Sequence, residues 1–324
     1  MAPVTYLEAI RSAMAEEMAR DERVFVLGED VGAYGGAFKA TEGLLGRFGA
    51  ERVIDTPISE TAIIGAAVGA AYLGMRPIAE MQFIDFIACC FNIVTNFAAK
   101  SRYRWGAGVP MVVRGPCGGG VGGGPFHSGN PEAYFAHTAG LKIVEPATPH
   151  DAKGLLKAAI RDDDPVLFLE HKYLYRRLKE DLPEDDYVVP IGKAIVRREG
   201  SDVSVVTFGA MVHVALDAAR RLEEDGLDIE VLDLRTLAPL DRQAILESVA
   251  RTSRALVLHE ASRTGGIGGE IAACIAEEGF EYLDAPVTRL ASLDTPVPYS
   301  PPLEHAFMPD ADKVIDAVRR LVRY

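Results

Sequence analysis

Two patterns of apolar positions alternate along the N-terminal part of the chain: short apolar runs, and longer stretches with helical spacing. The runs predict buried strands and the stretches predict helices. This alternation is typical of an α/β fold with a doubly wound parallel sheet. The predicted strands are 24–27, 52–55, 76–83, 110–114, 140–144 and 165–170, and the predicted helices are 5–20, 42–48, 57–73, 85–99, 131–135 and 151–161.

A charged stretch without a strong period, residues 173–186, predicts a linker to a second α/β domain. We therefore predict two domains, residues 1–186 and 187–324. The second domain is expected to contain strands 203–208, 229–232, 255–259 and 287–290, and helices 212–224, 241–251, 269–278 and 311–322.

The helix starts carry the first chemical signals. Thr5 with Glu8 predicts a capping box. Thr56 suits the cap of the next apolar helix, and Pro57 suits its first position. Gly65 and Gly69 would let another backbone approach this helix closely, so we expect the helix to be buried at an interface. Glu60 then lies at the mouth of an apolar helix, where a carboxylate is costly without a partner. It is either a capping residue, although the spacing fits a box poorly, or a buried carboxylate that hydrogen-bonds a ligand.

Two glycine-rich segments interrupt the pattern. The run 115–124 has seven glycines in ten residues, too many for a regular element, and no Gly-Lys-Ser/Thr follows as in a P-loop. It is either a surface loop or a mobile lid with His127 at its far hinge. The segment 265–269 resembles a dinucleotide fingerprint only loosely, and lacks the acid expected about twenty residues on, so it predicts a loop and a helix start.

Composition excludes several classes of protein. The net charge of −13 over 324 residues argues against binding to nucleic acid or to an anionic membrane. The four cysteines form no CxxC pair and indicate reduced thiols. Together with the absence of a signal-peptide pattern at the N-terminus, they predict a cytoplasmic protein. The longest apolar runs contain glycine and are too short to span a bilayer.

Several short motifs are spread along the whole chain: residues 28–32, 55–60, 80–85, 102–104, 126–133, 151–156, 230–236 and 259–261. Together they resemble one family, the β subunits of the thiamine-diphosphate-dependent, decarboxylating component of the 2-oxo acid dehydrogenase complexes. The set of motifs is specific although no single one is. The branched-chain enzymes are most similar in detail, and the pyruvate and acetoin enzymes share much of the rest.

This resemblance implies a fold and a set of roles. The first domain would receive the aminopyrimidine ring of the cofactor, and the second would be a transketolase-type C-terminal domain. Glu60 would hydrogen-bond a ring nitrogen and favour the imino form that takes a proton from the thiazolium carbon. Gln82 and Phe86 would contact the cofactor, and His127 would assist acyl transfer to the lipoyl group of an acyltransferase.

The sequence departs from the family pattern at two of these places. Phe86 stands where the branched-chain enzymes have Tyr, which keeps stacking but removes a phenol contact. Gly129 stands where Gln is usual, which loosens the loop after His127 and weakens the assignment of the substrate.

The resemblance also implies what other chains must supply. The chain has no Gly-Asp-Gly and only three Asn, so the diphosphate and its Mg²⁺ would be held by an α subunit in an α₂β₂ assembly, and this chain would be inactive alone. A structural potassium ion would be bound near Met111, Ala159, Asp162 and Asp164.

Three functions therefore compete. The first is a catalytic β subunit acting on a small 2-oxo acid, with the branched-chain acids favoured over pyruvate. The second is a non-catalytic interaction subunit whose acidic C-terminal domain docks the acyltransferase core. The third is a nucleotide-binding oxidoreductase based on residues 265–269.

Overall fold

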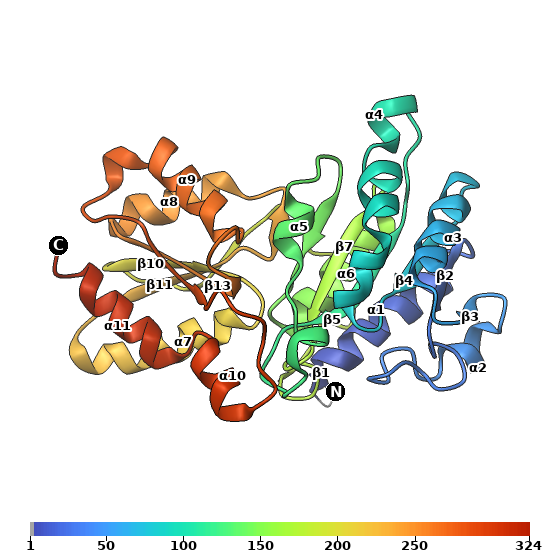
Figure 1. Ribbon diagram of the computed structural model, residues 1–324, viewed down its shortest axis with the longest axis horizontal. Helices are drawn as coiled ribbons and strands as arrows, with labels where there is room; N and C mark the ends of the chain where they lie inside the picture. Colours follow the sequence, from blue (N-terminus) through green and yellow to red (C-terminus); the bar gives the residue numbers. More distant parts are fainter. Residues whose placement is uncertain (1–2) are drawn as a thin grey trace. The chain divides into compact units, whose positions relative to one another are not determined.

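A computed structural model describes residues 3–324, which form two compact units (Figure 1). The first unit comprises the chain up to Cys117 and Tyr134–Ile191, and the second comprises Gly118–Ala133 and Gly192–Tyr324. The predicted boundary after residue 186 lies near the last crossing between the units. The excursion of residues 118–133 into the second unit was not expected from the sequence.

The sheet of the first unit is parallel and runs in the order β6-β7-β5-β4-β2-β3. Its strands are nearly continuous apolar runs because both faces are covered. Their bounds are β2 (Val24–Gly28), β3 (Val53–Asp55), β4 (Arg76–Glu80), β5 (Val112–Cys117), β6 (Lys142–Val144) and β7 (Val166–His171). A two-residue ladder joins β1 (Val4–Thr5) to β8 (Lys179–Glu180) in antiparallel fashion.

The order of the strands determines where a ligand site is expected. The chain passes from β2 outward to β3 and then returns to β4 on the other side of β2. Such a reversal opens a crevice at the carboxyl ends of the two neighbouring strands. The residues that follow β2 and β4 therefore lie at the preferred binding edge of this sheet.

The helices of the first unit cover its two faces. Helix α1 (Tyr6–Arg20) packs against α6 (Pro149–Arg161), and α3 (Glu60–Tyr72) packs against the 3₁₀ helix η1 (Ile84–Cys90) and the π-helix η2 (Ile93–Ala98). Two short helices, α2 (Leu44–Phe48) and α4 (Ser101–Trp105), complete this part, with the 3₁₀ turn η3 (Gly124–Phe126) and α5 (Glu132–Ala136) on the excursion and its return. The predicted capping box of α1 is confirmed, with Glu8 N donating to Thr5 Oγ1 at 3.2 Å and Thr5 N donating to Glu8 Oε2 at 2.7 Å.

Three local predictions in this unit were wrong. Helix α3 begins at Glu60 with Ser59 as its cap, so Thr56 and Pro57 lie outside it. Thr56 N donates to Gly28 O at 2.9 Å, and this tertiary contact keeps Thr56 extended beside β2. Residues 101–105, where no element was predicted, form a short helix. Strand β4 ends at Glu80, so strand alternation does not extend to Gln82.

The second unit has a sheet in the order β14-β13-β10-β11-β9, parallel except for β9 at one edge. In Figure 1, α7 and α11 lie together below this sheet, and α8 and α9 lie together above it. The bounds are β9 (Ile195–Arg198), β10 (Val203–Thr207), α7 (Met211–Leu222), η4 (Glu223–Asp225), β11 (Ile229–Asp233), β12 (Thr236–Ala238), α8 (Arg242–Thr252), β13 (Ala255–Ser262), α9 (Gly268–Glu278), η5 (Phe280–Tyr282), β14 (Thr288–Ser292), α10 (Pro301–Phe307) and α11 (Ala311–Leu321).

Every predicted helix and strand of the second domain is found in place, while β9, β12 and α10 were missed because they are short. Within residues 3–324, no helix combines the length and the apolar character needed to cross a bilayer.

Candidate functional site in the first unit, and a glycine-rich loop in the second

Acidic side chains gather where β2 and α3 approach each other in the first unit. Glu29 follows β2 directly, and burial, then the charges of Glu60 and Asp30, raise the pKa of its carboxyl group. Burial, then Cys89 and Glu60, also raise the pKa of the Cys90 thiol to about 12. Glu60 therefore lies between the end of β2 and helix η1, at the crevice that the strand order predicts.

Backbone contacts fix the two loops that border this crevice. The Asp55 carboxylate accepts from Gly32 N at 2.5 Å and from Ala33 N at 3.2 Å. A Cβ added at Gly32 would lie 2.5 Å from Asp55 Oδ2, so glycine is needed there for the close approach. On the other side, Thr61 Oγ1 donates to Cys89 O at 2.8 Å and ties the start of α3 to η1.

Two polar atoms at the crevice are buried without a partner among the described residues: Gln82 Oε1 and Thr56 Oγ1. Each follows the carboxyl end of a strand, β4 and β3 respectively. Because most buried polar atoms in proteins have a hydrogen-bond partner, such atoms call for a ligand or water. Gln82 was predicted as a site residue, whereas Thr56 was assigned only a capping role.

The other predicted residues of this site are half-buried. Phe86 lies in η1, and its exposure is intermediate, as is that of Glu60 at the first position of α3. The expectation that Glu60 and its helix are buried at an interface with another chain stays a prediction, because the structure contains one chain. One face of α3 is exposed and carries Thr61, Ala62, Ala66 and Gly69. A Cβ at Gly69 would meet nothing within 4 Å.

A buried ionic network lies beneath the crevice. Arg114 of β5 donates to both oxygens of Glu170, each at 2.6 Å, and to Glu80 at the end of β4. Tyr175 OH donates to Glu170 Oε2 at 2.7 Å. All three charged side chains are at most 4% exposed. The network joins β4, β5 and β7, so Glu80 has a structural partner and is not available to a ligand.

The glycine-rich segment belongs to the second unit, together with His127, which is half-buried. The backbone amides of Gly119, Gly120 and Gly122 donate to the side chains of Glu260 and Glu304. The interpretation of this run as a free surface loop is therefore wrong, because buried carboxylates hold it. Neither carboxylate was singled out from the sequence as an anchor.

A second buried acid lies beside this segment. Glu132 is fully buried, and both its carboxylate oxygens lack a hydrogen-bond partner within residues 3–324. Burial, then the charge of Glu260, raise its pKa to about 8. Glu132 therefore holds a proton at neutral pH.

The second glycine-rich segment packs against a histidine. A Cβ at Gly266 or Gly268 would lie 2.5 Å from the ring of His259, which is fully buried and stacks on Phe208. Helix α9 begins at Gly268, which confirms the predicted loop and helix start. The glycines thus make room for a side chain, which explains their spacing without a dinucleotide.

The four residues of the predicted potassium site lie near the start of β5 and the end of α6. The Asp162 carboxylate accepts from Lys142 Nζ at 2.7 and 2.6 Å, and Asp164 is paired with Arg102 at 2.5 Å. The carbonyl oxygens are also engaged: Met111 O accepts from Val166 N, and Ala159 O accepts from Asp162 N. A cation there would have to compete with these partners, so the potassium site stays a prediction.

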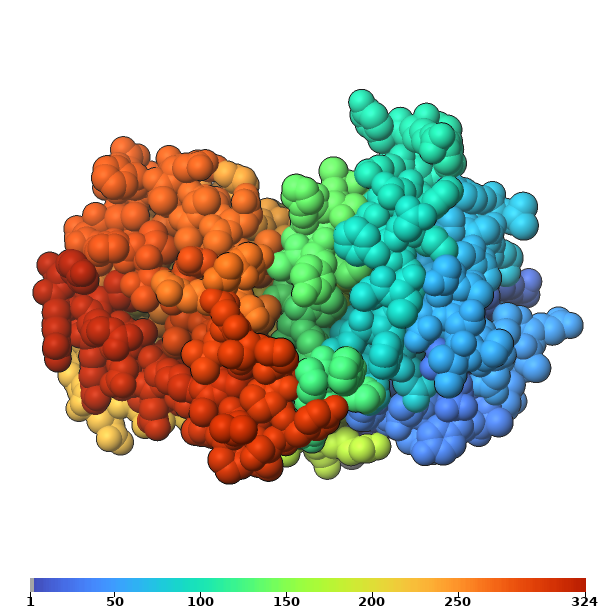
Figure 2. Space-filling model, viewed as in Figure 1, coloured from blue at the N-terminus to red at the C-terminus, as the bar shows by residue number. Residues whose placement is uncertain are grey.

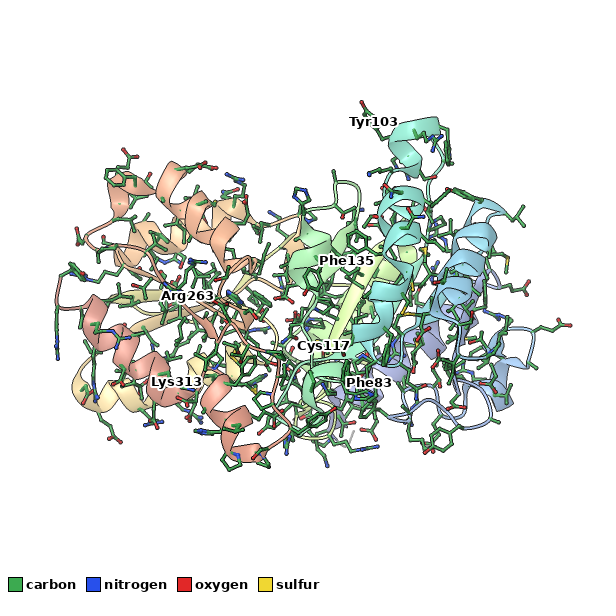
Figure 3. All side chains as sticks on the ribbon, viewed as in Figure 1. Phe83, Tyr103, Cys117, Phe135, Arg263 and Lys313 are labelled. Atoms are coloured by element: carbon green, nitrogen blue, oxygen red, sulfur yellow. The ribbon has the colours of Figure 1, made fainter. Side chains whose placement is uncertain are left out.

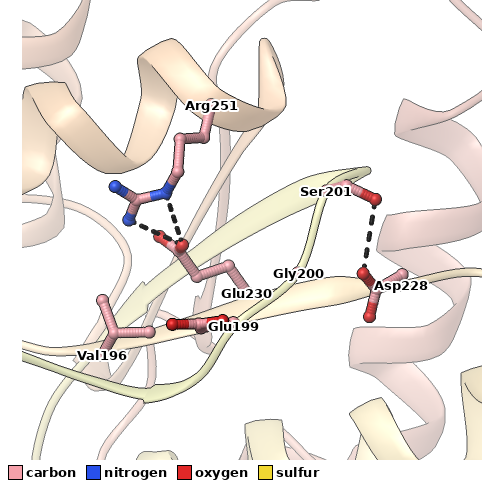
Figure 4. Close-up of a pocket in the computed structure, with 7 residues that line it drawn as sticks. All are labelled: Val196, Glu199, Gly200, Ser201, Asp228, Glu230 and Arg251. Atoms are coloured by element: carbon pink, nitrogen blue, oxygen red, sulfur yellow. Dashed lines mark hydrogen bonds and ion pairs between the residues drawn. The ribbon is translucent and has the colours of Figure 1, made fainter.

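A separate pocket of about 510 Å³ opens in the second unit and contains none of the predicted site residues (Figure 4). Arg251 donates to Glu230 Oε2 at 2.9 and 2.7 Å, and Ser201 donates to Asp228 at 3.3 Å. The pocket is lined by Val196, Glu199, Gly200, Ser201, Asp228, Glu230 and Arg251.

Comparisons with known proteins agree with this arrangement. The family model "Transketolase, pyrimidine binding domain" matches residues 2–177, and "Transketolase, C-terminal domain" matches residues 192–314. A solved structure described as "Split gene transketolase, inactive beta4 tetramer" superimposes with a TM-score of 0.81 over 99% of both chains, at 24% identity. The crevice at β2 and β4 thus lies in a domain of the pyrimidine-binding type.

Curated relatives match the chain over its full length. The 2-oxoisovalerate dehydrogenase subunit beta of Bacillus subtilis (strain 168) is 55% identical, with 100% of both chains covered. The pyruvate dehydrogenase E1 component subunit beta of the same strain is 45% identical, again with 100% of both covered. By fold and by sequence, this chain belongs to the family of β subunits of the 2-oxo acid dehydrogenases, enzymes whose β subunit works with an α subunit.

Proposed function

We propose that this chain is the β subunit of a branched-chain 2-oxo acid dehydrogenase, which decarboxylates the acid and transfers the acyl group to a lipoylated acyltransferase. Support comes from the higher identity to the 2-oxoisovalerate enzyme, 55% against 45% for the pyruvate enzyme. A pyruvate or acetoin dehydrogenase β subunit is the alternative, because the identities differ modestly and the departures at Phe86 and Gly129 fall within the family motifs.

The observation that carries a catalytic role is the pair of unpartnered polar atoms beside Glu60. Gln82 Oε1 and Thr56 Oγ1 are buried without partners among the described residues, as expected of a site shaped for a polar ring. Phe86 offers an aromatic face in the same region. These residues fit the aminopyrimidine of thiamine diphosphate better than they fit a purely structural loop.

Thiamine diphosphate, which Glu60, Gln82 and Phe86 would hold by its aminopyrimidine, would supply a nucleophilic carbon and an electron sink for the decarboxylation. Glu60 would hydrogen-bond the ring nitrogen and share a proton with it. The side-chain amide of Gln82 would orient the ring.

A partner chain is expected to cover Glu60. Helix α3 leaves an exposed face of small residues, and large apolar side chains are exposed on the segments around it. Tyr103, 99% exposed, points away from the end of α4 (Figure 3), and this end of α4 stands out from the surface in Figure 2. The exposed apolar residues are Ile58, Tyr72, Leu73, Phe91, Phe97, Tyr103 and Trp105.

Exposed apolar surface of this extent is typical of a protein interface. We infer that an α subunit binds this face in an α₂β₂ assembly and supplies the ligands of the diphosphate and Mg²⁺. Burial by that chain would place Glu60 in the dry environment that its role requires. In the second unit, we assign to His127 the proton transfer to the lipoyl group, a step that suits an imidazole side chain.

The test of the catalytic role is Glu60→Gln in the chain mixed with its α subunit. Gln keeps the shape but cannot hold the proton, so decarboxylation should fall about 100-fold or more. Glu51→Gln, on an exposed side chain of the first unit, is the matched control and should keep full activity. Full activity of Glu60→Gln would leave a non-catalytic interaction subunit as the better explanation.

The substrate is decided by a panel on the same mixture, with pyruvate, 2-oxoisovalerate and 2-oxoisocaproate compared by kcat/KM. The branched acids should exceed pyruvate, and the reverse order would favour the pyruvate enzyme.

A further inference from the structure

Two buried carboxylates bind the glycine-rich segment in the second unit. Glu260 Oε1, from β13, accepts from Gly119 N at 2.6 Å. Glu304, from α10, accepts from Gly120 N at 2.9 Å and from Gly122 N at 3.1 Å. Each carboxylate is 6% exposed. Three backbone amides within four residues are therefore held by side chains more than 140 residues away in the sequence.

The segment also fits closely against its neighbours. A Cβ at Gly119 would lie 2.9 Å from Met308 Sδ, and one at Gly124 would lie 2.1 Å from the ring of Tyr299. Gly124 has φ +67°, a conformation that favours glycine. The glycines here allow the backbone to pack closely and to form hydrogen bonds. They therefore fix the loop instead of making it flexible.

The same contacts reach His127. Its backbone amide donates to Gly124 O at 3.4 Å, and Gly118 N donates to Gly129 O at 3.2 Å, which closes the loop on itself. Beyond the histidine, Asn130 Nδ2 donates to Glu260 Oε1 at 3.0 Å. Glu260 therefore binds the loop on both sides of His127, and Glu304 binds its glycine-rich half.

We propose that Glu260 and Glu304 are positioning residues that clamp the loop 118–130 and so fix His127 for the transfer step. This inference rests on the proposed function and adds to it two residues that act through the backbone, without touching substrate. Carboxylates suit the task because charge-assisted hydrogen bonds to backbone amides are stronger than neutral ones.

The clamp itself is tested by amide hydrogen exchange on the full chain, alone and with its α subunit. Glu304→Ala should accelerate exchange in residues 118–124 at least about tenfold, since Gly120 and Gly122 lose their acceptor. Glu304→Gln, which keeps an acceptor oxygen, should give a smaller increase and guards against misfolding of the alanine variant. Glu277→Gln and Glu277→Ala, on an exposed helix position, are the matched controls. Unchanged exchange in Glu304→Ala would overturn the clamp.

The effect of the clamp on catalysis is tested by two assays on the enzyme reconstituted with its α subunit. Glu304→Gln and Glu260→Gln should lower acyl transfer to the lipoyl group about tenfold or more. Decarboxylation measured with an artificial electron acceptor should change less than about twofold, because that assay bypasses the loop histidine. Equal losses in both assays would overturn the positioning role. No turnover of any 2-oxo acid by the wild-type mixture would instead reject the proposed function, while the exchange result would still decide the clamp.

Discussion

Several carboxyl groups are buried in this chain, and the cost of burying each is offset in a different way. Glu80 and Glu170 are neutralised by Arg114, and Glu260 accepts from the backbone amide of Gly119 and the side-chain amide of Asn130. Glu132 has no hydrogen-bond partner within the described residues. A buried acid without a partner avoids the cost of its charge by keeping its proton. Glu132 is therefore expected to make the stability of the chain depend on pH.

Replacing Glu132 by Gln tests this expectation. The pKa of Glu132 is raised from 4.5 to about 8 in the folded chain, so between these values only the unfolded chain has lost the proton. Its contribution to stability is complete below pH 4.5 and is lost as pH rises to about 8. Since each pKa unit corresponds to about 1.4 kcal/mol, Glu132→Gln should be clearly more stable than the wild type at pH 8 and similar to it at pH 5.

The measurement is urea unfolding at pH 5, 6.5 and 8. Glu270→Gln, on an exposed side chain of α9, should follow the wild type at every pH. Parallel curves for Glu132→Gln and the wild type would mean that Glu132 is ionised in the folded chain.

At the scale of elements, packing between β13 and α9 explains a glycine pattern that looked like a binding motif. His259 projects from β13 into the space left by Gly266 and Gly268. Burial, then the charge of Arg289, lower the pKa of His259 to about 4, so the ring is neutral, and both its nitrogens are buried without a hydrogen-bond partner among the described residues. Helix α9 can approach its sheet only because these positions lack a Cβ.

Alanine substitutions at two adjacent glycines should separate this packing from helix propensity. Gly268→Ala would place a Cβ 2.5 Å from His259 Cδ2 and should destabilise the chain by about 1–3 kcal/mol. Gly269→Ala would lie no closer than 3.6 Å to Arg289 Nη1 and should be neutral or slightly stabilising in the helix. Thermal unfolding followed by circular dichroism compares the two, and equal Tm values would contradict the packing account.

At the scale of the whole molecule, the exposed face of α3 predicts that assembly is a condition for activity. Ala66→Arg adds a long charged side chain to this face, where the wild-type residue is exposed. We expect the variant to fold as the wild type does but to bind the α subunit at least about tenfold more weakly, because a charge would be buried at the interface.

Sedimentation of the mixed chains measures this binding. Ala250→Arg, at an exposed position of α8 in the second unit, is the control and should assemble normally. Normal assembly of Ala66→Arg would show that the α subunit binds elsewhere.

The sequence predicted the long amphipathic elements and the candidate residues of the site, because hydrophobic periodicity and motifs are local signals. It failed where contacts distant in sequence decide. Thr56 has the composition of a helix cap but is bonded to Gly28 O, and the glycine run has the composition of a flexible loop but is bonded by Glu260 and Glu304. The expected burial of Glu60 at an interface depends on a second chain and stays a prediction.

The excursion of residues 118–133 has a practical consequence for dissecting the protein. A gene divided at residues 191/192, between the two family models, would give fragments that seem to match whole domains. The first fragment would carry the glycine run without its acceptors, and the second would carry Glu260 and Glu304 without these backbone donors. Neither fragment would therefore keep the contacts that its residues make in the intact chain. Reaction steps should be assigned with point variants of the full chain rather than with truncated domains.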